Sequence, residues 1–407
     1  MILPQQIAAF SQSAIAGKQM PFDVFLIAGQ SNNHYGSTLD GAVDVGHARL
    51  RQWTQAAAVS SGAEPLDHVD AQANKIGYAV KFARDYYIPN LLSAARQVLL
   101  VPRAKGGTGF SANNWNPGDP EYTAAVNAAL AAVAARPSGA LKAILWHQGE
   151  QDQQVAMSGL NYRTALEAML VAMRTAFGLP NLPIVVGGMT ANTIGASGGA
   201  AIEYVIKNVV NRLSYTGFAD SQLPSSLGAS NVHFTAAEQR TMAGRYYDAY
   251  VAALTNVLSW STAMSMTFAD GDDVTGNAIN NYSIRQVIPA SVIPASGSRV
   301  RITFRAPAAN TMTVDDVSIV ERGSGADGAG APTQVYFNAG LAGFSIANNA
   351  TIVSDPLAFA LDETKSYIVI FDISSSGGNQ RQRQGGASLA AGYTAYYKAA
   401  TDSYNSQ

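Results

Sequence analysis

The feature that most constrains the fold of this chain is an alternation of short apolar runs with helical patterns over its first 257 or so residues. The apolar runs lie at residues 24–28, 97–102, 142–146 and 183–187, and the helical patterns at 70–95, 121–135, 162–177 and 235–258. Short, almost wholly apolar strands separated by helices are typical of a parallel sheet covered on both faces. We therefore predict a three-layer α/β/α fold with ligand sites at the carboxyl ends of its strands.

From about residue 260 the pattern changes, because apolar and polar residues now alternate at every second position. These runs lie around residues 300–304, 314–320, 334–337 and 367–373, with turn-forming clusters and no long helix between them. Such a pattern predicts an all-β sandwich of the jelly-roll-like type. We place the boundary near residues 259–264, which gives an α/β domain over 1–258 and an accessory β-sandwich domain over 259–407. Aromatic residues near the end could stack on sugars or pack in the core: Tyr393, Tyr396 and Tyr397.

Composition limits the partners and the chemistry. A net charge of −2 argues against nucleic acid or an anionic membrane as the main partner, since both usually require basic patches. Cysteine is absent, which excludes thiolate nucleophiles, cysteine-ligated metals and disulfides. No stretch approaches 18 apolar residues, and residues 1–18 do not resemble a signal peptide. We expect a soluble protein, compatible with a cytoplasmic location or with a viral particle.

Three polar segments follow predicted strands and could together form a serine esterase site. Gly-Gln-Ser-Asn occupies 29–32, Lys-Gly-Gly-Thr-Gly occupies 105–109, and Trp-His-Gln-Gly-Glu-Gln-Asp occupies 146–152. A serine nucleophile needs a base, a carboxylate that orients the base, and donors for the oxyanion. Ser31 is the candidate nucleophile. A serine at a strand end also suits a helix N-cap, and Asn33 replaces the second glycine of the α/β-hydrolase elbow.

His233, just before the helix expected from residue 235, is the candidate base. A structural histidine at the start of that helix is the alternative interpretation. The other four suit the role less well, because one lies only three residues from Ser31, one is expected to point away, and two lie in polar loops: His34, His147, His47 and His68. Glu150 is the candidate acid, with Asp152 as the alternative.

Gln148 and Gly107 are candidates for holding the oxyanion, although a tight turn also explains the glycines. Residues 107–112 match the relaxed dinucleotide pattern, but Asn-Asn-Trp-Asn-Pro-Gly at 113–118 cannot open the helix that this pattern requires. The acidic residues 270–273 could hold calcium, yet an ordinary acidic turn explains them as well. We expect no metal and no cofactor.

Together with Val-His-Phe-Thr at 232–235, these segments resemble the SGNH/GDSL hydrolase superfamily, and more narrowly the sialate O-acetylesterase and carbohydrate esterase family 6 group. The resemblance covers roughly residues 20–257 and implies an SGNH/flavodoxin-like sheet. It implies Ser31 as nucleophile and His233 as base, with the oxyanion held by the N–H groups of Ser31 and Gly107 and the side chain of Gln148.

One position departs from the superfamily pattern. The superfamily usually places aspartate three residues before the catalytic histidine, and Ser230 stands there in this chain. The glutamate of the group's Gln-Gly-Glu block can supply the missing charge, so Glu150 becomes the preferred acid.

The resemblance implies a metal-independent serine esterase that removes O-acetyl groups from a carbohydrate, such as an acetylated polysaccharide or a sialic acid. We also expect Asn32, Trp115 and Asp152 to contact this substrate. Two alternatives stay open. Ser230 favours a non-catalytic glycan-binding or structural protein on a degenerate hydrolase scaffold, and an esterase or lipase for longer acyl chains is the other.

Overall fold

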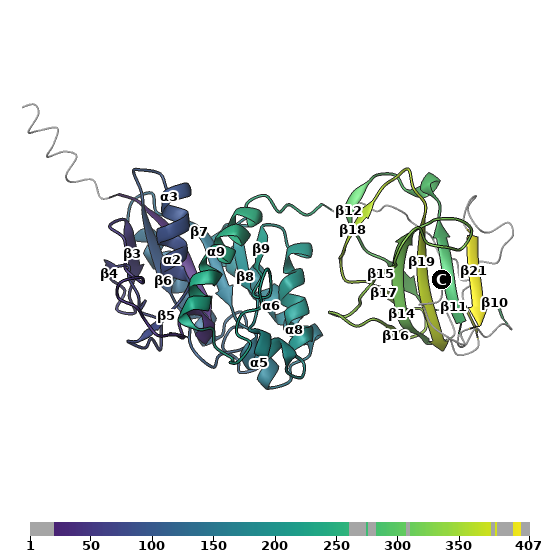
Figure 1. Cartoon of the computed structure of the whole chain (residues 1–407), viewed down its shortest axis with the longest axis horizontal. Helices are drawn as coiled ribbons and strands as arrows, with labels where there is room; N and C mark the ends of the chain where they lie inside the picture. Colours follow the sequence, from purple (N-terminus) through teal and green to yellow (C-terminus); the bar gives the residue numbers. More distant parts are fainter. Residues whose placement is uncertain are drawn as a thin grey trace, which may run out of the picture. The chain divides into compact units, whose positions relative to one another are not determined.

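The chain divides into two compact units, residues 1–257 and 258–407 (Figure 1). The computed structural model describes residues 20–259, 274–275, 282–306, 310–375, 379–380 and 394–399. The N-terminal segment 1–18, the acidic residues 270–273, Tyr393 and the side chain of Tyr397 lie outside this description.

The first unit is built on a seven-stranded sheet in the order β4-β3-β6-β1-β7-β8-β9. All neighbouring strands pair in parallel except β3 and β4. The prediction of an α/β unit with a parallel central sheet is confirmed. The strands are β1 Phe22–Gly29, β3 Leu50–Trp53, β4 Val59–Ser61, β6 Gln97–Pro102, β7 Ala140–His147, β8 Ile184–Gly187 and β9 Thr216–Ala219.

Two sets of helices accompany this sheet. Helix α9 contacts the helical run of α2, η2 and α3, whereas α6 contacts both α4 and α8 (Figure 1). Capping defines the helix ends: the side chain of Ser158 caps α6, and Thr235 and Glu238 form a capping box at the start of α9. The bounds are α2 Ala79–Lys81, η2 Phe82–Tyr87, α3 Ile88–Asn90, α4 Pro120–Ala134, α5 Glu150–Gln154, α6 Gly159–Phe177, α7 Ala191–Gly195, α8 Gly199–Lys207 and α9 Ala236–Ala253, with short 3-10 turns η1 Ser31–Asn33 and η3 Asn208–Asn211.

The helix predicted over residues 70–95 begins only at Ala79. Residues Lys75–Ile76 form strand β5, which pairs with β2 at Gly36–Ser37. Gly77 lies directly against the backbone of Asn33, where a Cβ atom would come within 1.9 Å of the carbonyl oxygen. Lys75–Ile76 is therefore an extended segment, and the glycine that follows it lies against the turn after β1.

The central strand β1 is buried along its whole length, so the site that follows it rests on a rigid element. Phe25 makes ring contacts with Phe82, Tyr87 and Tyr250 at centroid distances of 5.3, 4.7 and 5.7 Å. Burying an aromatic side chain of this size contributes about 1.5–3 kcal/mol. This packing fixes the sheet against both α9 and the 79–90 helical run.

The order of strands brings the three predicted site segments to one edge. Because β6, β1 and β7 are adjacent and parallel, the segments that follow them emerge side by side. Gly29 ends β1 with a φ of +118°, and a Cβ there would lie 2.1 Å from the carbonyl oxygen of His147. Only glycine allows this approach, which the hydrogen bond from Gln30 N–H to the same carbonyl (2.8 Å) then fixes.

In the second unit, the described residues form antiparallel β structure. The largest sheet has the order β15-β14-β19-β11-β21, with β16 pairing to β14. Phe304 on β13 packs against Phe337 and Phe344 at ring distances of 5.9 and 5.2 Å, within a core shared with the large sheet. The jelly-roll-like sandwich stays a prediction. The bounds are β10 Val274–Thr275, β11 Tyr282–Ile288, β12 Gly297–Val300, β13 Thr303–Arg305, β14 Met312–Glu321, β15 Thr333–Gln334, β16 Phe344–Ile346, β17 Thr351–Val353, β18 Leu357–Leu361, β19 Tyr367–Ser375, β20 Asn379–Gln380 and β21 Thr394–Ala399, with a 3-10 turn η5 at Ala290–Val292.

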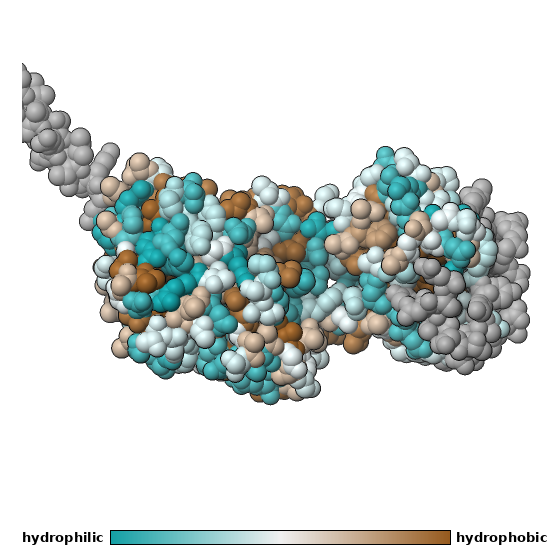
Figure 2. All heavy atoms as spheres, viewed as in Figure 1, coloured by the Kyte–Doolittle hydropathy of each residue, from teal (hydrophilic) through white to brown (hydrophobic). Residues whose placement is uncertain are grey.

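Two surface properties bear on partners. On the face drawn in Figure 2, apolar residues form several groups interrupted by polar ones. Within the described part of the chain, no helix combines the length and the apolar character that crossing a membrane requires.

Tyr396, one of the three aromatics considered for sugar stacking, packs beside a buried cluster that includes Val287 and Ile368.

Candidate active site

Ser31 and His233 meet directly at the carboxyl edge of the sheet. Ser31 opens the short turn after β1, and His233 lies in the loop before α9. His233 Nε2 is 2.9 Å from Ser31 Oγ, although 202 positions separate the two residues. Ser31 is 5% exposed, so its hydroxyl is largely shielded yet borders the surface. For Nε2 to accept the hydroxyl hydrogen, the neutral ring must carry its own hydrogen on Nδ1.

Asn32, the neighbour of Ser31, holds the histidine loop from both sides. Its Nδ2 donates to the carbonyl of Val232 (2.9 Å), and its Oδ1 accepts from the N–H of Phe234 (3.1 Å). The same Nδ2 also donates to Glu150 Oε1 (2.5 Å). Asn32 is fully buried. One amide therefore links the backbone on either side of His233 to the carboxylate of Glu150.

Glu150 is completely buried and belongs to this network, but it does not bond His233 in the described structure. Its Oε1 lies 3.2 Å from Nε2 of His147, whose Nδ1 is 3.1 Å from the hydroxyl of Tyr246. Within the described residues Glu150 Oε2 has no partner, and Glu150 makes no hydrogen bond to His233. Burial acts to raise the pKa of Glu150, but His147 and the hydrogen bonds of the carboxylate outweigh it and lower that pKa. Glu150 is thus held as a carboxylate.

The pKa of His233 reflects this environment. Burial lowers it below the ordinary value of 6.5, and the negative charge of Glu150 partly opposes the shift. Because the pKa of His233 is lowered, its imidazole stays neutral into mildly acidic solution. The opposing effect of Glu150 also shows that Glu150 acts on His233 through its field, in addition to the contacts made by Asn32.

Gln148 and the glycine-rich turn after β6 are held together by Asp152. The carboxylate of Asp152 accepts from Gln148 Nε2 (2.8 Å) and from the N–H groups of Phe110 and Ser111 (2.9 Å each). The side-chain hydroxyl of Ser111 is a further donor, at 2.5 Å. Asp152 is fully buried, so these charge-assisted bonds form in a low-dielectric setting. Asp152 therefore supports Gln148 and the turn, and it makes no hydrogen bond to His233 in the described structure.

The backbone N–H groups of Ser31 and Gly107 are among those at this edge that donate to no other described residue. Gly107 is exposed and has a φ of +65°, a conformation that favours glycine. Gln148 Nε2 adds a side-chain donor that makes only a long contact, 3.4 Å, to the carbonyl of Thr108 besides its bond to Asp152. The chain thus offers three N–H donors at the edge of the sheet that also carries the Ser31–His233 pair.

The three residues predicted to contact substrate occupy different places. Asn32, Trp115 and Asp152 are each fully buried. Trp115 packs edge-on against Trp146 and donates from Nε1 to the hydroxyl of Thr108 (2.8 Å). Each of the three supports a loop at the site, and their direct contact with substrate stays a prediction.

Several residues at the site were assigned no role from the sequence. Gln30 Oε1 accepts from the N–H of Gln151 (3.1 Å) and so ties the Ser31 turn to α5. The ring of Tyr35 lies 5.1 Å from that of His233. The ring of His34 is bonded to Asp70 at 3.0 Å. Only their closeness to Ser31 in sequence could have suggested Gln30, His34 and Tyr35, and nothing in the sequence marks Asp70.

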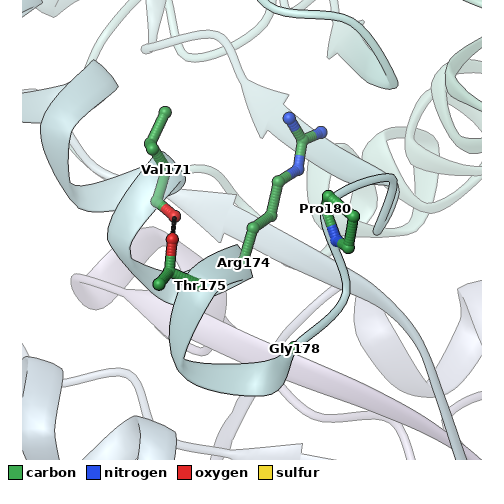
Figure 3. A pocket seen from close by; sticks show the side chains of 5 residues that line it. All are labelled: Val171, Arg174, Thr175, Gly178 and Pro180. Atoms are coloured by element: carbon green, nitrogen blue, oxygen red, sulfur yellow. Dashed lines mark hydrogen bonds between the residues drawn. The ribbon is translucent and has the colours of Figure 1, made fainter.

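A surface cavity of about 300 Å³ lies elsewhere, at the C-terminal end of α6. Figure 3 shows Arg174 projecting from this helix beside the loop that carries Pro180. The guanidinium already donates to three carbonyl groups before β8 and β9, those of Leu182, Ser214 and Tyr215. These carbonyls precede the strands, so the cavity lies at the sheet edge opposite Ser31. Among the described residues no group of three or more His, Cys, Asp or Glu side chains could hold a metal ion.

Comparison with known proteins places this arrangement in context. A family model described as "Carbohydrate esterase, sialic acid-specific acetylesterase" matches residues 21–252. A probable carbohydrate esterase of Arabidopsis thaliana is 30% identical over 195 residues, which are 46% of this chain and 69% of that protein. The crystal structure of NanS is similar in fold, with a TM-score of 0.51 at 18% identity, over 58% of this chain and 98% of that chain.

Proposed function

The chain belongs to the carbohydrate esterase family of sialic acid-specific acetylesterases, and we propose that it hydrolyses O-acetyl esters of a carbohydrate through an acyl-enzyme on Ser31. Membership makes the protein a carboxylic ester hydrolase. The observation that carries the serine mechanism is the 2.9 Å contact between Ser31 Oγ and His233 Nε2 at the carboxyl edge of the sheet.

In the first half of the reaction, His233 Nε2 accepts the hydroxyl hydrogen while Ser31 Oγ attacks the acetyl carbonyl carbon. The tetrahedral intermediate collapses as the bond to the sugar oxygen breaks, and His233 returns the proton to that oxygen. The acetyl group is left on Ser31. Water then attacks this ester with His233 again as the base, and acetate leaves as Ser31 regains its proton.

The developing oxyanion is the charge that the site must stabilise. We assign this role to the N–H groups of Ser31 and Gly107 and to Nε2 of Gln148, since the first two lack acceptors in the described structure. One such donor contributes about 2.7–4 kcal/mol to transition-state stabilisation in a protease. Asp152 contributes by fixing Gln148.

Glu150 takes the place of the aspartate that Ser230 replaces, but it acts indirectly. Its charge stabilises the imidazolium that forms on His233, and its bond to Asn32 fixes the loop that carries the histidine. A carboxylate that bonds the histidine also selects its tautomer, whereas Glu150 influences orientation and charge.

The test compares the native protein with Ser31→Ala on a chromogenic acetate ester and on O-acetylated sugars. We expect hydrolysis by the native protein and a loss of at least about 10³-fold in the variant. Ser221→Ala is a matched control. Ser221 is fully buried after β9, and its hydroxyl donates to the carbonyl of Met189, so this variant should retain activity. Equal inactivity of the native protein and Ser31→Ala would instead favour a non-catalytic glycan-binding role.

The acyl specificity is tested separately with a series of esters of increasing chain length. We expect kcat/KM to be highest for acetate. A maximum at longer chains would identify a lipase-like esterase in place of an acetylesterase.

A further inference from the structure

A second carboxylate, that of Asp70, connects the turn that contains Gly107 with Tyr35, the residue beside His233. Its Oδ2 accepts from the hydroxyl of Tyr35 (3.1 Å) and from the N–H of Gly106 (2.9 Å). Gly106 immediately precedes Gly107, the residue assigned to the oxyanion. The ring of Tyr35 lies beside the imidazole of His233, with centroids 5.1 Å apart. One oxygen atom therefore contacts both the oxyanion turn and the residue that borders the base.

The surroundings of Asp70 fix its carboxylate in this position. Its Oδ1 pairs with Nε2 of His34 at 3.0 Å, and the His34 ring stacks on that of His68 at 4.4 Å. His68 in turn accepts from the N–H of Ala104, in the segment between β6 and the glycine-rich turn. Burial opposes ionisation of Asp70, but the hydrogen bonds from His34 and Gly106 outweigh it, so its pKa is lowered. The group is a carboxylate near neutral pH.

The hydroxyl of Tyr35 is oriented by its other neighbour. Gln72 Nε2 donates to the Tyr35 oxygen at 3.2 Å, so the Tyr35 hydrogen is directed to Asp70. A chain of contacts thus runs from His233 through Tyr35 to Asp70 and on to Gly106. It is distinct from the Glu150–Asn32 network described above, because the Asn32 side chain bonds to Glu150, Val232 and Phe234 and to none of these side chains in the described structure.

We propose that Asp70 is a positioning residue, which aligns His233 through Tyr35 and the oxyanion turn through Gly106 for the same reaction. The inference rests on the proposed function, since it concerns the efficiency of the Ser31 reaction. Asp70 does not touch the reacting atoms. Its effect should therefore appear in kcat, with little change in KM.

The test is a double-mutant cycle of Tyr35→Phe and Asp70→Ala, assayed on a chromogenic acetate ester. We expect Asp70→Ala to lower kcat about 10²-fold, because small displacements of catalytic groups have effects of this size. Tyr35→Phe should lower kcat about tenfold or more, because it removes a hydrogen bond to a charged carboxylate. In the Asp70→Ala background Tyr35→Phe should have no further effect, because its hydroxyl has already lost the acceptor.

Two further variants separate positioning from stability. Asp70→Asn should recover most of kcat, since its oxygen can accept from Tyr35 and Gly106 while its amide donates to His34. Tyr87→Phe is the matched control, because it removes a tyrosine hydrogen bond to Asp23 (2.6 Å) near the opposite end of β1. It should lower the melting temperature and leave kcat unchanged.

The outcomes distinguish this inference from the proposed function. A native protein no faster than Ser31→Ala would overturn both. An active native protein, with Asp70→Ala and Tyr35→Phe within twofold of its kcat, would overturn the positioning role alone. Independent effects that multiply in the double variant would also overturn it. The rate at which an organophosphate ester inactivates Ser31 gives a second readout, and it should fall in parallel with kcat.

Discussion

Asn32 is the residue whose removal tests the indirect role of Glu150. Asn32→Ala deletes one charge-assisted hydrogen bond to Glu150 and two neutral bonds to the histidine loop. A charged bond contributes about 1.5–3 kcal/mol and a neutral one about 1 kcal/mol, so the unfolding free energy should fall by about 3.5–5 kcal/mol. For a unit of this size that corresponds to a melting temperature lower by roughly 7–20 °C.

The same deletion should affect catalysis beyond its effect on stability. Without Asn32 no hydrogen bond in the described structure joins the backbone around His233 to Glu150, and the 2.9 Å contact with Ser31 loses this support. A misplacement of about 1 Å lowers a rate about 10²-fold, and we expect kcat to fall by that factor. KM should change little, because Asn32 is fully buried.

The assay measures initial rates on a chromogenic acetate ester well below the melting temperature of the variant, with the folded fraction checked by circular dichroism. Asn256→Ala is the control: its amide donates to the carbonyls of Val210 and Thr216, far along the chain from the histidine loop. It should destabilise the fold without lowering kcat. If Asn32→Ala loses stability as expected but keeps kcat within threefold of the native value, the reasoning is refuted.

Four further results are expected. The pKa of His233 is lowered by burial, so the acidic limb of kcat/KM, where the base becomes protonated, should lie below pH 6.5; a limb at or above 6.5 contradicts this. Glu150→Gln should lower kcat by about 10- to 100-fold, well short of the ~10⁴-fold loss seen when a carboxylate bonded to a catalytic histidine is neutralised. Gln148→Ala should lower kcat by about 10²- to 10³-fold if its amide meets the oxyanion. Burial raises the pKa of Glu203 from 4.5 to about 8, so stability should fall as pH rises through that interval; Glu203→Gln, which keeps an acceptor for Met189 N–H, should flatten the fall in melting temperature.

The strands and the edge on which the site lies could be predicted because their signals are local. Each of the runs at 24–28, 97–102, 142–146 and 183–187 is apolar enough to be a buried strand on its own, and each is found in the sheet. Parallel pairing then determines that the segments after β6, β1 and β7 share an edge. The short strands β3, β4 and β9 gave no comparable signal, since β3 and β4 are only partly buried.

The supporting contacts could not be predicted, because they join segments that no pattern relates. The helical spacing over 70–95 concealed a strand at Lys75–Ile76, whose place depends on pairing with Gly36–Ser37. That pairing is also what brings the segment carrying Asp70 beside the Ser31 turn. Likewise, no sequence pattern distinguishes a buried asparagine from an exposed one, so the complete burial of Asn32 could not be predicted.

Two carboxylates flank His233, and neither bonds its imidazole in the described structure. Glu150 reaches the histidine loop through Asn32, and Asp70 reaches the ring through Tyr35. A carboxylate bonded to the ring would raise the pKa of the histidine, whereas burial here lowers it. The two carboxylates therefore contribute orientation more than basicity. On the proposed mechanism the site would tolerate Ser230 in place of an aspartate, because Asn32 fixes the loop that carries His233 from both sides and alignment with Ser31 would not require a third residue that bonds the ring.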